Sequence, residues 1–295
     1  MYTTGLSVLV ILEAFLPAIA IGVWLYFTDR VEREPIGLLV VIFALSMIFM
    51  IPCAMGEQLL TTLFFPHEGM SSVLALFVYY IFVVGLLEEA SKGLAALIPA
   101  WRNKHFNHSY DAIVYCVISA LGFAGFENIS YIMAYGHGVV WGRALFSVPF
   151  HACCGLIMGL FIAHAKACQL KGNKAGKWRY LLLGWIIPAM VHGIYDAGAT
   201  LQESGMLSFT TFATLFVCVV VFLLWRRHGA ASVDALMEGA VETMPVHPRK
   251  EKKVVEGGDT PIIEMFDING DWTCPICGFP NDGSNAFCPR CGCKK

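Results

Sequence analysis

Long apolar runs alternate with short polar connections along the first 225 residues of the chain. A helix needs about 20 apolar residues to cross the hydrocarbon core of a bilayer, and each run is at least that long. Alternating apolar and polar positions over about ten residues, the pattern of a membrane β-barrel, do not occur in these runs. The pattern therefore predicts an all-α polytopic membrane protein whose seven helices span residues 6–27, 36–65, 71–100, 111–135, 139–165, 178–201 and 206–225.

The composition supports this prediction. Hydrophobic residues make up 57% of the chain and charged residues 14%, with a mean hydropathy of +0.64. A soluble domain carries about 25% charged residues, so a soluble enzyme, a disulfide-stapled secreted domain and a disordered chain are all excluded. Only the C-terminal part has ordinary soluble composition. We therefore expect a transmembrane domain at 1–227, a linker with a short amphipathic stretch at 228–268, and a small zinc-ribbon-like finger at 269–295.

Basic residues gather in every second predicted connection. Connections rich in Lys and Arg stay in the cytoplasm, so the pattern predicts an outside N-terminus and a cytoplasmic C-terminal tail in a multi-pass protein of the cell membrane. The other connections hold one basic residue, Arg143. The residues in the predicted cytoplasmic connections are Arg30, Arg33, Arg102, Lys104, Lys166, Lys171, Lys174, Lys177, Arg179, Arg226 and Arg227.

Ionisable residues recur within the predicted helices. Such residues are costly at mid-membrane and usually face a bundle interior or a water-filled cavity. The spacing i,i+4 places Glu88 with Lys92, and His192 with Asp196, on one face of a helix. Counted from the predicted cytoplasmic ends, one acid or imidazole from each of four consecutive helices lies within roughly 6 Å of the others along the membrane normal. The candidate residues are Glu88, Glu89, Lys92, Glu127, His151, His192 and Asp196.

Two further acids are left out of this predicted site. Glu13 lies at a similar depth in the first helix, and Glu57 lies nearer the outer side of the second. Cys153 and Cys154 follow His151 closely, and we expect both to pack in the core as small hydrophobic side chains.

Carboxylates and imidazoles at one level can bind a divalent metal, activate water or move protons. Hydrolytic zinc sites use three His, Glu or Asp ligands and keep one position for water, and Glu127, His151 and His192 form such a set. The sequence contains neither a Gly-x-Ser-x-Gly nor a His-Glu-x-x-His motif, so it does not support a serine or zincin-type mechanism. The same side chains would also serve a proton- or cation-coupled transporter, although no internal repeat of the kind common in transporters occurs.

Purely structural roles stay open for single motifs. Glu88 and Lys92 could form a buried ion pair that orients helices, and His192 with Asp196 could be a hydrogen-bonded pair. Phe123 is expected to pack rather than to take part in chemistry.

Taken together, Glu-Glu-x-x-Lys at 88–92, Phe-x-x-x-Glu at 123–127 and His-x-x-x-Asp at 192–196 resemble the PrsW family of intramembrane proteases, a distant relative of the CAAX prenyl proteases. The resemblance covers roughly residues 80–200. It implies an intramembrane endopeptidase for single-pass membrane proteins, of which an anti-sigma factor cut in regulated intramembrane proteolysis is an example. It implies catalytic roles for Glu88, Glu89, Glu127, His151, His192 and Asp196, with Lys92 in support.

The mechanism expected from this set uses Glu88 or Glu89 as general base on a water held near Glu127 and the two histidines, with Asp196 orienting His192. The surplus of acids favours a divalent metal, zinc first; without a metal, a glutamate and a protonated histidine would divide the same roles.

The polar tail carries two Cys-x-x-Cys pairs ten residues apart, and Trp272 and Asn281 accompany them as in zinc fingers of the Ran-binding-protein type. Four thiolates satisfy tetrahedral zinc, and a segment this short needs the metal in order to fold. We expect a cytoplasmic protein as the partner of the finger rather than nucleic acid. The predicted structural zinc ligands are Cys274, Cys277, Cys288 and Cys291.

Overall fold

The computed structural model describes residues 7–28, 33–65, 72–201, 272–273 and 280–281. Two long segments each join several elements without a break and contain π-helical turns, η1 and η3. The helices are α1 (Val8–Thr28), α2 (Ile36–Phe64), α3 (Val73–Tyr79), η1 (Tyr80–Gly85), α4 (Leu86–Ala100), α5 (Ser109–Tyr135), η2 (His137–Val139), α6 (Val140–Gly142), η3 (Arg143–Ser147), α7 (Val148–Leu170) and α8 (Lys174–Thr200).

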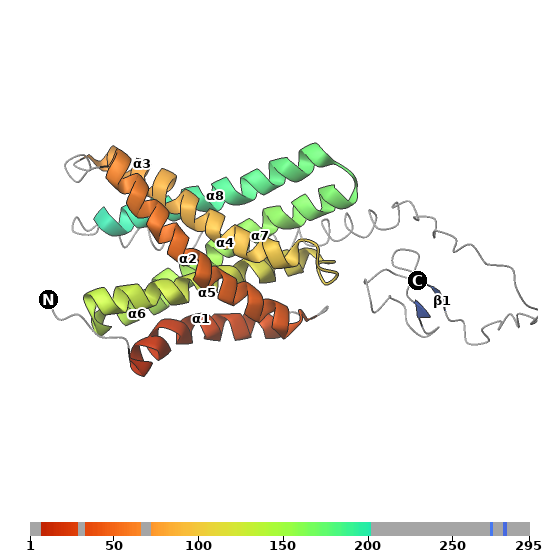
Figure 1. Ribbon diagram of the computed structural model, residues 1–295, viewed down its shortest axis with the longest axis horizontal. Helices are drawn as coiled ribbons and strands as arrows, with labels where there is room; N and C mark the ends of the chain where they lie inside the picture. The colour runs from red at the N-terminus through yellow and green to blue at the C-terminus, as the bar shows by residue number, and fades with distance from the viewer. Residues whose placement is uncertain (1–6, 29–32, 66–71, 202–271, 274–279, 282–295) are drawn as a thin grey trace, which may run out of the picture.

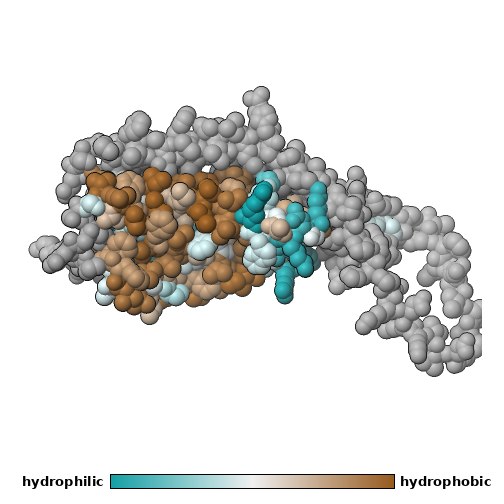
Figure 2. Space-filling view, turned by 90° about the horizontal axis from the view of Figure 1, so that it is seen from above, coloured by the Kyte–Doolittle hydropathy of each residue, from teal (hydrophilic) through white to brown (hydrophobic). Residues whose placement is uncertain are grey.

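Six helical segments within these residues are long and apolar enough to cross a membrane. They are Val8–Thr28, Ile36–Phe64, Val73–Ala100, Ser109–Tyr135, His137–Leu170 and Lys174–Thr200, and they confirm the first six predicted spans. Figure 2 shows apolar side chains over the visible face of the described bundle and hydrophilic ones gathered at one end. The predicted seventh span at 206–225, the linker and the four finger cysteines lie outside the described residues.

The connection between the fifth and sixth spans is shorter than the hydropathy pattern predicts. The helices α7 and α8 extend to residues 170 and 174, so Lys166, Lys174, Lys177 and Arg179 lie in helical end turns and not in a loop. Charged end turns are possible because long basic side chains lay their stems over apolar neighbours. The Lys166 Nζ donates to the Trp101 carbonyl oxygen at 2.8 Å and lies 4.6 Å from the centre of the Phe106 ring.

The helix α5 lies at the centre of the bundle and packs against α1, α2, α4 and α7 (Figure 1). The helix α8 in turn packs on α7, α4 and η1. Glycines allow close approach of the helices, as is common in membranes. A Cβ at Gly159 would lie 2.6 Å from the Cα of Ile113, and one at Gly155 would lie 2.7 Å from the Cys116 carbonyl oxygen. These contacts bring α7 against α5 about one and two helical turns beyond His151.

Outside the bundle, two short strands are described, β1 (Trp272–Thr273) and β2 (Pro280–Asn281). They pair antiparallel, with Trp272 opposite Asn281 and Thr273 opposite Pro280.

Candidate active site

The ammonium group of Lys92 lies at the centre of a buried polar cluster formed by α4, α7 and α8. Its Nζ is 2.9 Å from Glu88 Oε2, 2.7 Å from Glu89 Oε1 and 3.0 Å from His151 Nδ1. Lys92 is 1% exposed and Glu89 is 0% exposed. The ring of Phe123 lies 4.6 Å from the Nζ, so this residue contributes a cation–π contact as well as packing. The predicted pairing of Lys92 with the two glutamates is present.

Carboxylates face both ring nitrogens of His192. The Nδ1 lies 2.8 Å from Glu89 Oε1, and the Nε2 lies 3.3 Å from Asp196 Oδ2 and 3.6 Å from Glu88 Oε2. Without a metal, an acceptor on each side suits a ring that donates from both nitrogens, although the Lys92 Nζ also lies 3.4 Å from Nδ1; as a metal ligand the ring would give up the proton of the coordinating nitrogen. The predicted i,i+4 contact between His192 and Asp196 is present, and it fixes the ring orientation.

The carboxylate of Glu127 connects His151 to α5. The His151 Nε2 lies 3.0 Å from Glu127 Oε2, and the same oxygen accepts a hydrogen bond from Arg143 Nη2 at 2.6 Å. Because Lys92 can only donate to the Nδ1 of His151, the proton of the neutral ring must be on Nε2, facing Glu127. Glu127 therefore holds His151 in one tautomer.

Arg143 belongs to this site, although the sequence pattern places it in a connection between helices. It begins η3 within the fifth span, where its Nε donates to Asn128 and its guanidinium lies 3.8 Å from the centre of the Tyr131 ring. Extending the fifth helix back to residue 137 would have identified it, because Arg143 then precedes His151 by about two helical turns.

Two local features aim these side chains at one another. The π-helical turns η1 and η3 end three residues before Glu88 and four before His151, and such turns are frequent at functional sites. The helix α8 also approaches η1 very closely: a Cβ at Gly85 would lie 2.3 Å from the Ala189 carbonyl oxygen, and one at Gly193 would lie 2.4 Å from the Ile81 Cα. This approach places His192 against Glu89.

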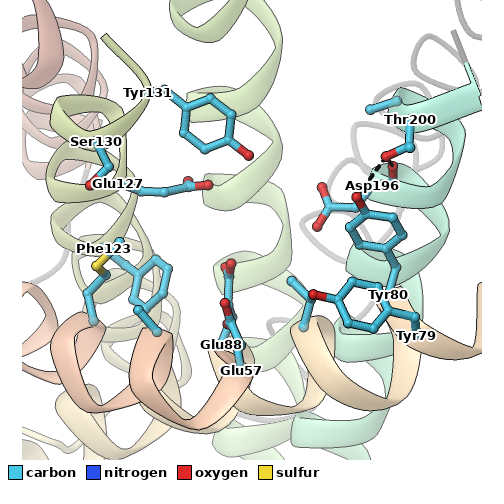
Figure 3. A pocket seen from close by; sticks show the side chains of 14 residues that line it. Glu57, Tyr79, Tyr80, Glu88, Phe123, Glu127, Ser130, Tyr131, Asp196 and Thr200 are labelled. Atoms are coloured by element: carbon cyan, nitrogen blue, oxygen red, sulfur yellow. Dashed lines mark hydrogen bonds between the residues drawn. The ribbon is translucent and has the colours of Figure 1, made fainter. Parts of the chain in front are cut away.

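A cavity of about 320 Å³ opens beside the cluster, between α2, the third span, α5 and α8. In Figure 3 the carboxylates of Glu88, Glu127 and Asp196 point into it from different sides. Glu57, which the sequence analysis leaves out of the predicted site, also lines the cavity. A lone acid in an otherwise apolar predicted helix was the available signal. The lining residues are Met50, Ala54, Glu57, Tyr79, Tyr80, Val84, Glu88, Phe123, Glu127, Ser130, Tyr131, Asp196, Ala199 and Thr200.

Two sets of three side chains could hold a metal ion within the described residues. They are Glu88, His151 and His192, and Glu89, Cys154 and His192; in each set the ligand atoms lie within 4.8 Å of one another. The predicted set of Glu127, His151 and His192 is not among them, because its ligand atoms do not all lie within 4.8 Å of one another. The Glu127 carboxylate contacts Arg143 and His151 instead. One carboxylate with two imidazoles matches hydrolytic zinc sites.

The charges of the cluster also fit a bound cation. Among the described residues, five carboxylates meet two permanent cations here, Lys92 and Arg143, and buried charge requires compensation. The Glu89 Oε2, moreover, is buried without a hydrogen-bond partner. The residues present therefore fit a divalent metal. The five carboxylates are Glu57, Glu88, Glu89, Glu127 and Asp196.

All seven residues predicted for the membrane site thus lie in one region, drawn from the third to sixth spans. Cys154 is buried, as expected of a core residue, and it also lies beside the cluster.

Comparisons with known proteins agree in one result. The sequence model of the PrsW family of intramembrane metalloproteases matches residues 34–225. The Protease PrsW of Clostridioides difficile strain 630 is 32% identical over 248 residues, covering 82% of this chain and 97% of the relative. The Protease PrsW of Oceanobacillus iheyensis is 31% identical over 212 residues, covering 72% and 93%, and that of Bacillus subtilis strain 168 is 30% identical over 209 residues, covering 71% and 88%. No solved structure matches the chain.

Proposed function

This chain belongs to the PrsW family of intramembrane metalloproteases and is a multi-pass intramembrane protease, and from that premise we propose that it hydrolyses a peptide bond of single-pass membrane proteins at the cluster around Lys92. The observation that carries the proposal is the cavity into which Glu88, Glu127 and Asp196 point, beside two buried imidazoles. It offers a polar volume within apolar helices, which hydrolysis inside a membrane requires. The transporter alternative is not favoured, since the matched relatives are proteases.

We propose that Glu88, His151 and His192 hold a divalent metal, zinc first. The support is their mutual distance, their burial and the surplus of carboxylates. When bound, the metal would polarise the scissile carbonyl and make water a better nucleophile. This assignment replaces Glu127 with Glu88 in the ligand set expected from the sequence, because Glu88 is the carboxylate near both imidazoles.

The remaining residues divide the work of positioning and proton transfer. Glu127 lines the cavity, and one of its oxygens is held by Arg143 and His151, which leaves the other to accept a proton from the attacking water. In this proposal Glu127 takes the role of general base that the sequence analysis gives to Glu88 or Glu89. Glu89 does not line the cavity, and we assign it to holding Lys92 and His192 in place. Asp196 orients the His192 ring.

Substitutions test this assignment directly. Glu88→Gln and His192→Ala should each abolish cleavage of a candidate single-pass substrate by the purified protein, while expression and thermal stability in detergent stay close to those of the parent. Glu13→Gln is the matched control, because Glu13 pairs with His137 at 2.6 Å and does not line the cavity. Cleavage by both cluster variants at the parent rate would overturn the proposed site.

Chelation tests the metal. Activity should be lost to a strong chelator and restored by zinc, in the parent chain and equally in a full-length Cys274→Ser, Cys288→Ser variant. That variant removes the expected zinc of the tail, which would otherwise complicate the result. Full activity after exhaustive chelation would instead support the metal-free mechanism.

For the substrate and topology we propose the assignments drawn from the sequence: an anti-sigma-like single-pass protein as substrate, and a tail in the cytoplasm. The gathering of hydrophilic side chains at one end of the bundle supports the orientation (Figure 2). We further propose that Cys274, Cys277, Cys288 and Cys291 bind a structural zinc and that the finger recognises a cytoplasmic protein. The pairing of β1 with β2 supports it, since these strands flank residues 274–279, which contain the first Cys-x-x-Cys pair.

A further inference from the structure

Glu57 lines the cavity, yet the proposed hydrolysis does not use it. Its Oε1 accepts a hydrogen bond from the Cys53 thiol at 3.2 Å. Within the described part of the chain, no Lys, Arg or His lies within ion-pair distance of this carboxylate. Each of the three other acids on the cavity wall has such a partner: Glu88 has Lys92, Glu127 has Arg143 and Asp196 has His192. Glu57 is therefore the cavity carboxylate whose charge is not compensated.

The rest of the cavity wall suits a cation. Among the described residues its lining includes no basic side chain, and it includes the aromatic rings of Tyr79 and Tyr80. The other two rings on its wall, Phe123 and Tyr131, already face Lys92 and Arg143. Two of the phenol groups are held in place, since Tyr79 hydrogen-bonds to Thr61 at 3.1 Å and Tyr80 to Thr200 at 2.8 Å. Aromatic faces attract Lys and Arg, and the attraction strengthens when the cation leaves water. Figure 3 shows Glu57 beside Glu88, with Tyr79 and Tyr80 on the side of the cavity where Asp196 lies.

We propose that Glu57 is a specificity-determining residue that binds a Lys or Arg side chain of the substrate close to the scissile bond. The inference rests on the proposed function, because it treats the cavity as the place where the substrate lies. A carboxylate and an ammonium each cost much free energy within the membrane, and the cost is lower when the two form an ion pair. Basic residues are rare within spanning segments, so a carboxylate that binds one would distinguish a few substrates from most single-pass proteins. Glu57 would thus favour cleavage where a basic residue reaches the cavity.

A binding experiment with the full-length protein tests the subsite independently of catalysis. The probes are synthetic Leu/Ala peptides of about 24 residues, long enough to span a bilayer, each with a single Lys at a different position. Peptides with norleucine or Glu at the same positions are the references. At one or more positions the Lys peptide should bind about 10- to 100-fold more tightly than its norleucine reference, as expected for one charge-assisted hydrogen bond.

Variants identify the residue responsible. Glu57→Gln should remove the preference for Lys, and Glu57→Lys should transfer it to the Glu peptide at the same position. Glu13→Gln, which removes a carboxylate outside the cavity, should leave the preference unchanged. No preference for Lys in the parent, or an equal preference in Glu57→Gln, would overturn the proposal.

Cleavage of the same segments within single-pass fusion proteins separates the two proposals. Cleavage without any charge preference would refute the subsite and leave the protease assignment intact. A Glu57-dependent preference in binding, with no fusion cleaved at any position, would support the subsite and count against the proposed site of hydrolysis.

Discussion

Gly193 determines how closely α8 packs against the third span. Replacing it with alanine, which adds a single methyl group, should disrupt the site. A Cβ at this position would lie 2.4 Å from the Ile81 Cα and 2.5 Å from the Ile81 nitrogen. Both are backbone atoms, which cannot rotate away as a side chain could. Ordinary contacts begin near 3.4 Å, so Gly193→Ala must separate α8 from η1 by about 1 Å.

The separation acts on the neighbouring residue, His192. Its Nδ1 lies 2.8 Å from Glu89 Oε1, and a further 1 Å would take this contact beyond hydrogen-bonding distance. A misplacement of about 1 Å costs about 100-fold in rate, which corresponds to about 2.7 kcal/mol in activation free energy. We expect Gly193→Ala to lower kcat/KM by about this factor and also to lower the temperature of thermal unfolding in detergent.

The assay compares cleavage rate and unfolding temperature with those of Gly37→Ala. Gly37 lies in α2, and a Cβ there would meet nothing within 4 Å. Alanine favours a helix interior over glycine by about 1 kcal/mol and the first turn, where Gly37 lies, by less, so without a clash the substitution should stabilise the protein slightly. The two variants are therefore expected to differ in sign. A Gly193→Ala protein with parental activity and an equal or higher unfolding temperature would refute the packing argument.

Two further predictions concern charge and metal. Arg143→Lys should retain part of the activity, because it keeps a cation beside Glu127. Arg143→Gln should lower kcat and change KM less. Equal kcat values in the two variants would show that the charge does not position Glu127. Cys274→Ser should lower the bound zinc by about one ion per chain without preventing membrane insertion. Elemental analysis against a Cys168→Ser control measures the loss. An unchanged zinc content would contradict the proposed zinc finger.

The sequence contains enough local information to predict six spans and the contacts within a helix. Glu88 with Lys92 and His192 with Asp196 follow from i,i+4 spacing alone, and both are present. Contacts between helices depend on how each helix is rotated and how closely it packs, and a single sequence does not encode these plainly. The sequence groups Glu127 with His151, and the two are in contact. The second partner of Glu127 could not be predicted, because it is Arg143, which counting charges between apolar runs assigns to a connection.

The omission of Glu57 has a related cause. Counting residues from the predicted end of the second helix places Glu57 away from the predicted level of the site. The helix α2 crosses the other helices obliquely in Figure 1, so distance along it is a poor measure of depth in the bundle. The structure places Glu57 on the same cavity as Glu88. Depth counting assumes parallel helices, and it holds best for the spans that pack side by side around α5.

The π-helical turns explain why regular periodicity could not supply the remaining geometry. A π-helical turn closes hydrogen bonds one residue later than an α-helical turn, so the residues beyond it are rotated by up to about 100° relative to an uninterrupted helix. In the third span the turn η1 separates α3, which has no buried residue, from α4, which buries Glu88, Glu89 and Lys92. In the fifth span η3 carries Arg143 and precedes His151. Both irregular turns therefore lie next to the groups that must converge, and a continuous α-helix through either segment would direct them elsewhere.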